Sequence, residues 1–215
     1  MQENDEQSSG ISPQYDPMRV LALTDGVFAI IMTILVLELH VPVVSTNEEL
    51  KTWGVALSYK LLLYFASFLL AGVYWVGHRS LFSLVRRVNT GLLWINIIFL
   101  MIAALIPVGA SLLGQYPRMP LALRAYGVLL FLLAAWRLVM YLYVTSRHDL
   151  LIRTVSPRVK KRVIAVMIFA PTLFLISTIL SPYFPKFSLI LYVITPPMFI
   201  TMITLVNRTE RAHTG

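Results

Sequence analysis

The 215-residue sequence contains no cysteine, and only 13% of its residues are charged, whereas 58% are hydrophobic. Without cysteine the chain has no disulfide bridges, no cysteine zinc sites and no thiol nucleophile. A soluble globular domain carries about a quarter charged residues. The composition therefore excludes a water-soluble enzyme or a nucleic-acid-binding module, in spite of a formal net charge of +8. An integral membrane protein with several spans is the class that fits.

Signatures of catalysis, metal binding and carbonyl-based ion selection are also missing. His40, His78, His148 and His213 share no metal-ligand spacing. There is no Gly-rich phosphate loop, no G-x-S-x-G and no H-E-x-x-H. The TVGYG filter of potassium channels is absent as well. We therefore expect no enzyme activity, no catalytic residues, no bound metal and no cofactor.

Long apolar runs are what the sequence has instead. A helix needs roughly 20 apolar residues to cross about 30 Å of hydrocarbon, and six segments meet this requirement. They are Arg19–Val41, Trp53–Gly77, Val88–Leu113, Leu121–Ser146, Val159–Leu180 and Phe187–Val206. We predict an all-α integral membrane protein with six transmembrane helices in residues 18–207. Residues 1–17 are expected to be a mobile tail and residues 208–215 a short tail.

The basic residues between these segments predict the orientation. The basic residues that follow the second and fourth segments are expected on the same side of the membrane as both chain ends. They outnumber the basic residues on the other side. The first group is Arg79, Arg86, Arg87, Arg147, Arg153, Arg158, Lys160, Lys161 and Arg162; the second is Lys51, Arg118, Arg124 and Lys186. By the positive-inside rule, both termini are cytoplasmic. Membrane lipids are the expected surroundings, and the Arg158–Arg162 cluster either sets the topology or binds anionic lipid.

Asp25 is a charged residue inside the first segment and needs a partner, because charges at membrane depth are costly. Arg19 lies six residues earlier, about 240° around a helix, so the two side chains do not share a face. The partner must lie on another helix or another subunit, and His78, Arg79 and Asn96 are candidates. Such a polar cluster either locks the bundle or senses protons or ions.

The same segment presents a second, apolar face. Ile30, Thr33, Ile34 and Leu37 follow one another at helical spacing. Asp25 lies about 140° away from Ile30 around the helix. In a symmetric oligomer this face either rings a central axis as a hydrophobic constriction or meets lipid and neighbouring helices.

Three motifs resemble one known family. The stretch from Arg19 to Ile30, RVLALTDGVFAI, resembles the R-x-x-x-F-S-D-G-V-F-A-I opening of the transmembrane protein 175 family. Trp75 and His78 are similar to its W-x-x-H element, and Asn96 and Pro107 to its third span. Leu23 and Thr24 stand where the family has Phe and Ser.

The resemblance implies a homotetrameric, potassium-permeable channel for monovalent cations, with a fold unlike that of the classical potassium channels. The first helix of each subunit would line the pore, with a narrow ring at Ile30 and further rings at Ile34 and Leu37. Thr33 would favour potassium modestly over sodium. A structural network would brace the first helix through Arg19, Thr24, Asp25, Trp75, His78 and Asn96. The resemblance also implies a bacterial cytoplasmic membrane.

Two other functions stay open from the residues alone. One is a proton-coupled secondary transporter in which Asp25 and His78 relay the proton. The other is a membrane-embedded lipid-modifying enzyme, which needs a catalytic polar cluster at one interface. A tetramer is required by the channel and not by the other two.

Overall fold

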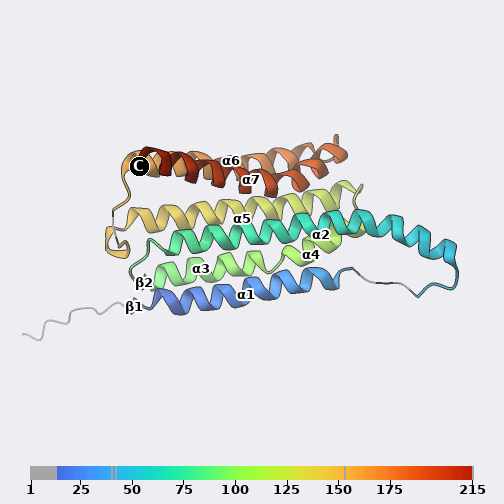
Figure 1. Cartoon of the computed structure of the whole chain (residues 1–215), viewed down its shortest axis with the longest axis horizontal. Helices are drawn as coiled ribbons and strands as arrows, with labels where there is room; N and C mark the ends of the chain where they lie inside the picture. The colour runs from blue at the N-terminus through green and yellow to red at the C-terminus, as the bar shows by residue number, and fades with distance from the viewer. Residues whose placement is uncertain (1–13, 40, 42, 153, 215) are drawn as a thin grey trace, which may run out of the picture.

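Long helices that lie side by side make up the computed structural model, which describes residues 14–39, 41, 43–152 and 154–214 (Figure 1). The helices are α1 (Pro17–Leu37), α2 (Asn47–Phe82), α3 (Thr90–Ala103), α4 (Ile106–Gln115), α5 (Pro120–Ser146), α6 (Pro157–Leu180) and α7 (Pro185–Thr214). A 3₁₀ turn, η1 (His148–Leu150), follows α5, and β1 (Gln14–Tyr15) pairs antiparallel with β2 (Val88–Asn89).

Several helices begin at residues that cap or pre-form a first turn. The Asp16 carboxylate accepts a hydrogen bond from the backbone N–H of Met18 at 2.9 Å, and Pro17 opens α1. The Asn89 side chain accepts from the N–H of Leu92 at 2.8 Å at the start of α3. These side chains satisfy backbone donors that have no partner within a helix. Proline also opens α5, α6 and α7, where its missing N–H costs nothing.

The helices form two groups around α2 and α5. α1 packs against α2, α3 and α4, whereas α6 and α7 pack against α5 and α2. In Figure 1, α1 and the α6–α7 pair consequently lie on opposite sides of α2 and α5. Aromatic side chains fill the first group, where Phe28 of α1 lies 6.1 Å from Phe99 of α3 between ring centroids. Both rings are buried.

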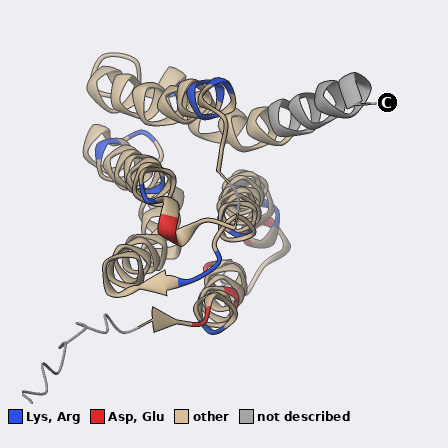
Figure 2. Cartoon of the chain, turned by 90° about the vertical axis from the view of Figure 1, so that its left-hand side faces the viewer, with Lys and Arg blue, Asp and Glu red and all other residues tan. Residues whose placement is uncertain are grey.

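The start of α1 and the end of α7 lie at the same end of the bundle (Figure 1). The ends of α2 and α5 and the start of α6 lie there too, so the segments rich in arginine and lysine meet at this end. Figure 2 looks onto it and shows the basic residues around the helix ends. The first and last described helices thus have their outer ends on the same side of the bundle. The cytoplasmic location of the two termini stays a prediction.

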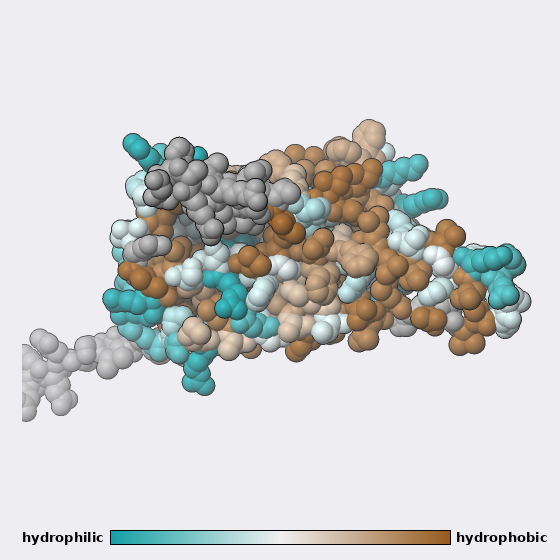
Figure 3. Space-filling model, viewed as in Figure 1, coloured by the Kyte–Doolittle hydropathy of each residue, from teal (hydrophilic) through white to brown (hydrophobic). Residues whose placement is uncertain are grey.

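Five helical segments of the described chain are long and apolar enough to cross a membrane. They are Pro17–Leu37, Asn47–Phe82, Thr90–Gln115, Pro120–Ser146 and Pro157–Leu180. Pro185–Ile200 is a shorter apolar helical stretch at the position of the sixth expected span. The space-filling view agrees, since hydrophobic surface covers the middle and hydrophilic groups gather toward both ends (Figure 3).

The structure corrects the predicted boundaries in three places. Gln14–Tyr15 are held by β2 and Asp16 caps α1, so only residues 1–13 of the expected mobile tail stay outside the described chain. The third span consists of α3 and α4 with a break between them, because Pro107 lacks the N–H that would continue α3. α7 is helical to Thr214 and so takes in most of the expected short tail.

The second helix is also longer than expected. α2 has 36 residues and so measures about 54 Å, well above the roughly 30 Å of a hydrocarbon layer. Its first turns carry Glu48, Glu49 and Lys51 and reach beyond the other helices in Figure 1. These polar residues precede the apolar run, and the Thr46 side chain caps the helix there by accepting from the Glu49 N–H.

Candidate functional site

The first helix divides into a buried face and an exposed face. Its buried residues are Val20, Thr24, Phe28, Ile31 and Leu35, which recur every three or four positions along one side. They pack against α2, α3 and α4. The opposite side of α1 is largely exposed among the described residues.

Four residues on that opposite side form a continuous surface, which we name the exposed stripe: Ile30, Thr33, Ile34 and Leu37. Ile30 is 59% exposed and Leu37 is 67% exposed. The family resemblance assigns these residues to a pore, and all four are exposed in the single chain. Their role in a pore stays a prediction.

The hydroxyl of Thr33 is oriented by its own helix. It donates to the carbonyl oxygens of Ile30 at 2.9 Å and Ala29 at 3.0 Å. Since the hydroxyl proton is used within the helix, the oxygen lone pairs remain available on the exposed side. An oxygen in this state accepts hydrogen bonds or contacts a cation.

Behind the buried face lies a neutral polar group that we name the Asn96 cluster: Thr24, His78 and Asn96. The Asn96 amide donates to Thr24 Oγ1 at 3.3 Å, and its Oδ1 lies 2.7 Å from His78 Nε2. Because an amide oxygen only accepts, His78 must donate through Nε2. All three side chains are fully buried, so the cluster links α1, α2 and α3 out of contact with solvent.

Aromatic rings enclose the imidazole of this cluster. His78 stacks on Phe82 at 4.3 Å and on Phe99 at 5.6 Å between ring centroids. Its Nδ1 atom is buried and has no hydrogen-bond partner among the described residues. A neutral imidazole suits these surroundings, because a charge between two apolar rings would lack compensation.

Asp25 of α1 has two partners on consecutive turns of α2, Trp75 and Arg79. Its Oδ1 accepts from the indole Nε1 of Trp75 at 2.7 Å, and its Oδ2 lies 3.5 Å from Arg79. The Arg79 guanidinium also lies over the Trp75 ring at 5.4 Å. Of the candidate partners named from the sequence, Arg79 makes the ion pair, while His78 and Asn96 bond to each other. This arrangement ties α1 to α2 at a half-buried position.

Arg19 is not part of this network in the single chain. Its residue is exposed, and the structure gives its side chain no hydrogen bond or ion pair among the described residues. Helical geometry places Arg19 about 20° from Ile30, on the side of the exposed stripe. Arg19 therefore makes no bracing contact within the described chain. The predicted network also extends between subunits, and this part of the role of Arg19 stays a prediction.

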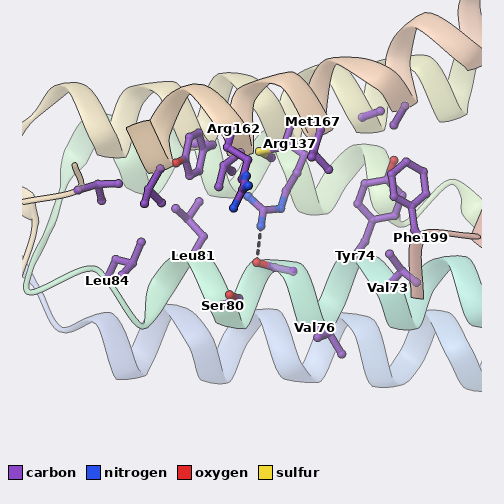
Figure 4. A pocket seen from close by; sticks show the side chains of 18 of the residues that line it. Val73, Tyr74, Val76, Ser80, Leu81, Leu84, Arg137, Arg162, Met167 and Phe199 are labelled. Carbon is purple, nitrogen blue, oxygen red and sulfur yellow. Dashed lines mark hydrogen bonds between the residues drawn. The ribbon is translucent and has the colours of Figure 1, made fainter. Parts of the chain in front are cut away.

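Sequence reasoning missed a second site, centred on Arg137 of α5. The long stem of an arginine within a span can carry its charge to the membrane surface. Instead, Nη2 donates to the carbonyl oxygen of Gly77 in α2, and Nη1 is buried without a hydrogen-bond partner among the described residues. A cavity of about 600 Å³ lies beside this guanidinium, between α2, α5 and α6 (Figure 4). The one signal in the sequence that could have indicated this site is the position of Arg137 deep within the fourth apolar segment.

Metal ligation has no support in the described part of the chain. No group of three or more histidine, cysteine, aspartate or glutamate side chains gathers there at a spacing that holds a metal ion. The expectation about cofactors is not tested by this observation.

Comparison with known proteins identifies related channels. Residues 19–107 match the sequence model of the family described as endosomal/lysosomal potassium channel TMEM175. A protein of Chryseobacterium sp. (strain P1-3) named as a potassium channel is 36% identical over 118 residues, which cover 54% of this chain and 59% of the relative. The chain thus spans about three fifths of that relative's length. This family consists of ion channels and not enzymes, in agreement with the sequence prediction.

Longer but more distant matches cover most of the chain. The endosomal/lysosomal proton channel TMEM175 of Danio rerio is 25% identical over 191 residues, which cover 86% of this chain and 37% of that protein. The crystal structure of a lysosomal potassium-selective channel TMEM175 homologue from Chamaesiphon minutus superposes with a TM-score of 0.71 at 27% identity. That match covers 86% of this chain and 97% of the homologue.

Proposed function

We propose that this multi-pass membrane protein, of which residues 19–107 match the TMEM175 family, is a member of that family and a potassium-permeable cation channel. Four copies surround a central pore, and α1 of each subunit lines it. The membrane is the bacterial cytoplasmic membrane, with both termini in the cytoplasm. Bacterial relatives named as potassium channels support the permeant ion.

The observation that carries the proposal is the exposed stripe on α1. A helix near one side of a bundle, with its far face uncovered, suits contact with identical helices around a symmetry axis. The stripe carries branched apolar side chains and one hydroxyl, and its four residues bear no charge. Such a lining discriminates only weakly between potassium and sodium, so selectivity for potassium over sodium is modest.

Ile30 closes the pore in this proposal. A narrow ring of isoleucine side chains holds water poorly, and a hydrated ion cannot pass a neck from which water is expelled. Ile34 and Leu37 follow at one-turn spacing and extend the apolar lining away from the charged end of the bundle. Opening requires the four α1 helices to separate or rotate.

Thr33 supplies the polar contact for the ion. Its proton is bonded to the helix backbone, so the oxygen lone pairs face outward. Four such oxygens around an axis replace part of the hydration shell of a potassium ion. They offer fewer fixed dipoles than a carbonyl filter, which agrees with modest selectivity.

The test is cation flux into liposomes that contain the purified protein at a verified oligomeric state. Potassium, sodium and caesium gradients are run in parallel with protein-free vesicles. We expect passive flux that follows the electrical driving force and is greater for potassium than for sodium. No flux from a verified tetramer would contradict the channel proposal.

A proton-coupled transporter is the second candidate, and vertebrate relatives named as proton channels give a reason to test it. The geometry disfavours a relay through Asp25 and His78. The structure gives these two side chains no hydrogen bond to each other, and aromatic rings enclose the imidazole. Saturable potassium uptake that requires an imposed proton gradient would support the transporter and contradict passive conduction.

A further inference from the structure

Arg137 carries a positive charge into the bundle without a matching negative charge. Lys51–Glu48 and Arg79–Asp25 are ion pairs between described residues, and neither includes Arg137. One arm of its guanidinium bonds to the Gly77 carbonyl, and the other arm, Nη1, is buried without a partner. A buried unpaired cation is costly, so its retention requires an anion or a polar group that the described residues do not supply.

The cavity beside Arg137 has the dimensions of a ligand site. Its volume of about 600 Å³ is within the range of sites that hold small molecules. Leu81 and Val73 of α2 and Val163 and Met167 of α6 give it mainly apolar walls. Neither carboxylate nor imidazole is among the lining residues, so the cavity lacks the base that lipid hydrolysis would need. Binding is the chemistry that it supports.

A second arginine shares this cavity. Arg162 of α6 is an exposed residue that also lines the cavity beside Arg137. Figure 4 shows the guanidinium groups of Arg137 and Arg162 in the same part of the cavity. Two like charges that face one apolar space repel each other, and an anion between them relieves the repulsion. Two arginines also provide paired donors for phosphate oxygens.

The site lies near one membrane surface. Gly77 is five residues from the end of α2, so the Arg137 guanidinium is about 8 Å below that helix end. Ser156 and Thr154, which precede α6, line the cavity at the same end. This is the end where the basic connections gather, which the positive-inside rule assigns to the cytoplasm. A phospholipid of the inner leaflet reaches this depth with its headgroup, and its chains extend toward the bilayer centre.

From these observations we propose that the cavity between α2, α5 and α6 binds one anionic phospholipid of the inner leaflet. The phosphate lies between Arg137 and Arg162, and an acyl chain lies along the apolar walls formed by Leu81, Val163 and Met167. No residue of α1 lines this cavity, so the site is separate from the exposed stripe and does not depend on the channel proposal. A lipid there joins the α6–α7 pair to α2 and α5.

Native mass spectrometry of the full-length protein tests the site with two defined lipids. The protein is titrated with palmitoyl-oleoyl phosphatidylglycerol, which is anionic, and with the matching phosphatidylcholine, which is zwitterionic. We expect one phosphatidylglycerol per chain to be retained at collision energies that remove phosphatidylcholine. Equal retention of the two lipids would overturn the proposal.

Three variants locate the bound lipid. R137Q and R162Q should each weaken phosphatidylglycerol retention by about tenfold, the effect of losing a charge-assisted hydrogen bond. R158Q is the matched control, because Arg158 is an exposed arginine of α6 that does not line the cavity. Its retention should equal that of the wild type. If R158Q loses as much lipid as R162Q, the attraction is a general one to the basic surface and the proposal fails.

Two further experiments distinguish loss of lipid binding from a folding defect, and lipid binding from the binding of a small anion. V163W fills the apolar part of the cavity without changing a charge, and it should displace the lipid while the protein elutes as the wild type does on size exclusion. This variant decides the question if R137Q does not fold. Inorganic phosphate at millimolar concentration should leave phosphatidylglycerol bound. Displacement by phosphate alone would show a small-anion site in place of a lipid site.

Discussion

The indole N–H of Trp75 donates to the carboxylate of Asp25 across 2.7 Å and so joins α1 to α2. Arg79, one turn further along α2, lies 3.5 Å from the other carboxylate oxygen and covers the indole ring. One carboxylate on α1 therefore meets two side chains of α2. This contact fixes the rotation of α1 about its axis and thereby the direction in which the exposed stripe faces.

Replacing Trp75 with phenylalanine should destabilise the protein, because it keeps an aromatic ring and removes the hydrogen bond to the half-buried Asp25. A hydrogen bond to a charged group that is partly screened by solvent contributes about 1.5 kcal/mol. For a chain of this length the thermal unfolding midpoint should fall by about 3–6 °C. Trp94→Phe is the control, since Trp94 is 59% exposed and its replacement should leave the midpoint unchanged. Equal midpoints for the two variants would contradict a bracing role.

The length of the apolar runs predicted most of the spans, because an apolar run of sufficient length has few other stable forms in a membrane. Helical spacing also separated Asp25 from Ile30, and in the structure Asp25 contacts α2 whereas Ile30 is exposed. The partners of Asp25 required the structure, because the match between turns of α1 and α2 depends on how the helices slide along each other. Sequence spacing contains no information about that offset.

The cavity beside Arg137 could not be predicted for a related reason. A long cationic side chain can reach the membrane surface or turn inward, and helical geometry allows both. The inward direction of Arg137 depends on Gly77. This residue has no Cβ to block the guanidinium, and its carbonyl oxygen accepts a hydrogen bond from it. Only the packing of α2 against α5 brings the two together.

The Asn96 cluster predicts a non-additive response to mutation. Asn96→Leu leaves the His78 N–H buried without an acceptor and should lower the free energy of unfolding by about 2 kcal/mol. The double variant with His78→Phe removes that orphaned donor and places a third ring against Phe82 and Phe99. It should be more stable than Asn96→Leu alone, by at least about 1 kcal/mol. Thermal unfolding of the two single variants and the double variant measures the coupling; simple additivity would show that the hydrogen bond contributes nothing.

Thr33→Ala should reduce the preference for potassium over sodium without abolishing conduction. The substitution removes the oxygen whose lone pairs face away from the helix, and the permeability ratio should fall by about threefold, equivalent to about 0.7 kcal/mol. Thr33→Ser restores the hydroxyl and should restore the ratio. Thr172→Ala is the matched control, because Thr172 is exposed on α6 and donates to the carbonyl oxygen of Ile168 in the same way. Reversal potentials under potassium and sodium gradients give the ratio, and an unchanged value in Thr33→Ala would place ion selection elsewhere.

Ile30→Asn should increase cation flux in the absence of any stimulus. The asparagine side chain has as many non-hydrogen atoms as that of isoleucine but offers a carbonyl oxygen and an amide to water, so a neck lined by it stays hydrated. A rise of about tenfold corresponds to a barrier lower by about 1.4 kcal/mol. Ile179→Asn is the control: Ile179 of α6 is also 59% exposed, and the same polar group there should leave the flux unchanged. Liposome flux at equal protein content compares the variants. Wild-type flux in Ile30→Asn, or an equal rise in both variants, would show that the constriction does not lie at Ile30.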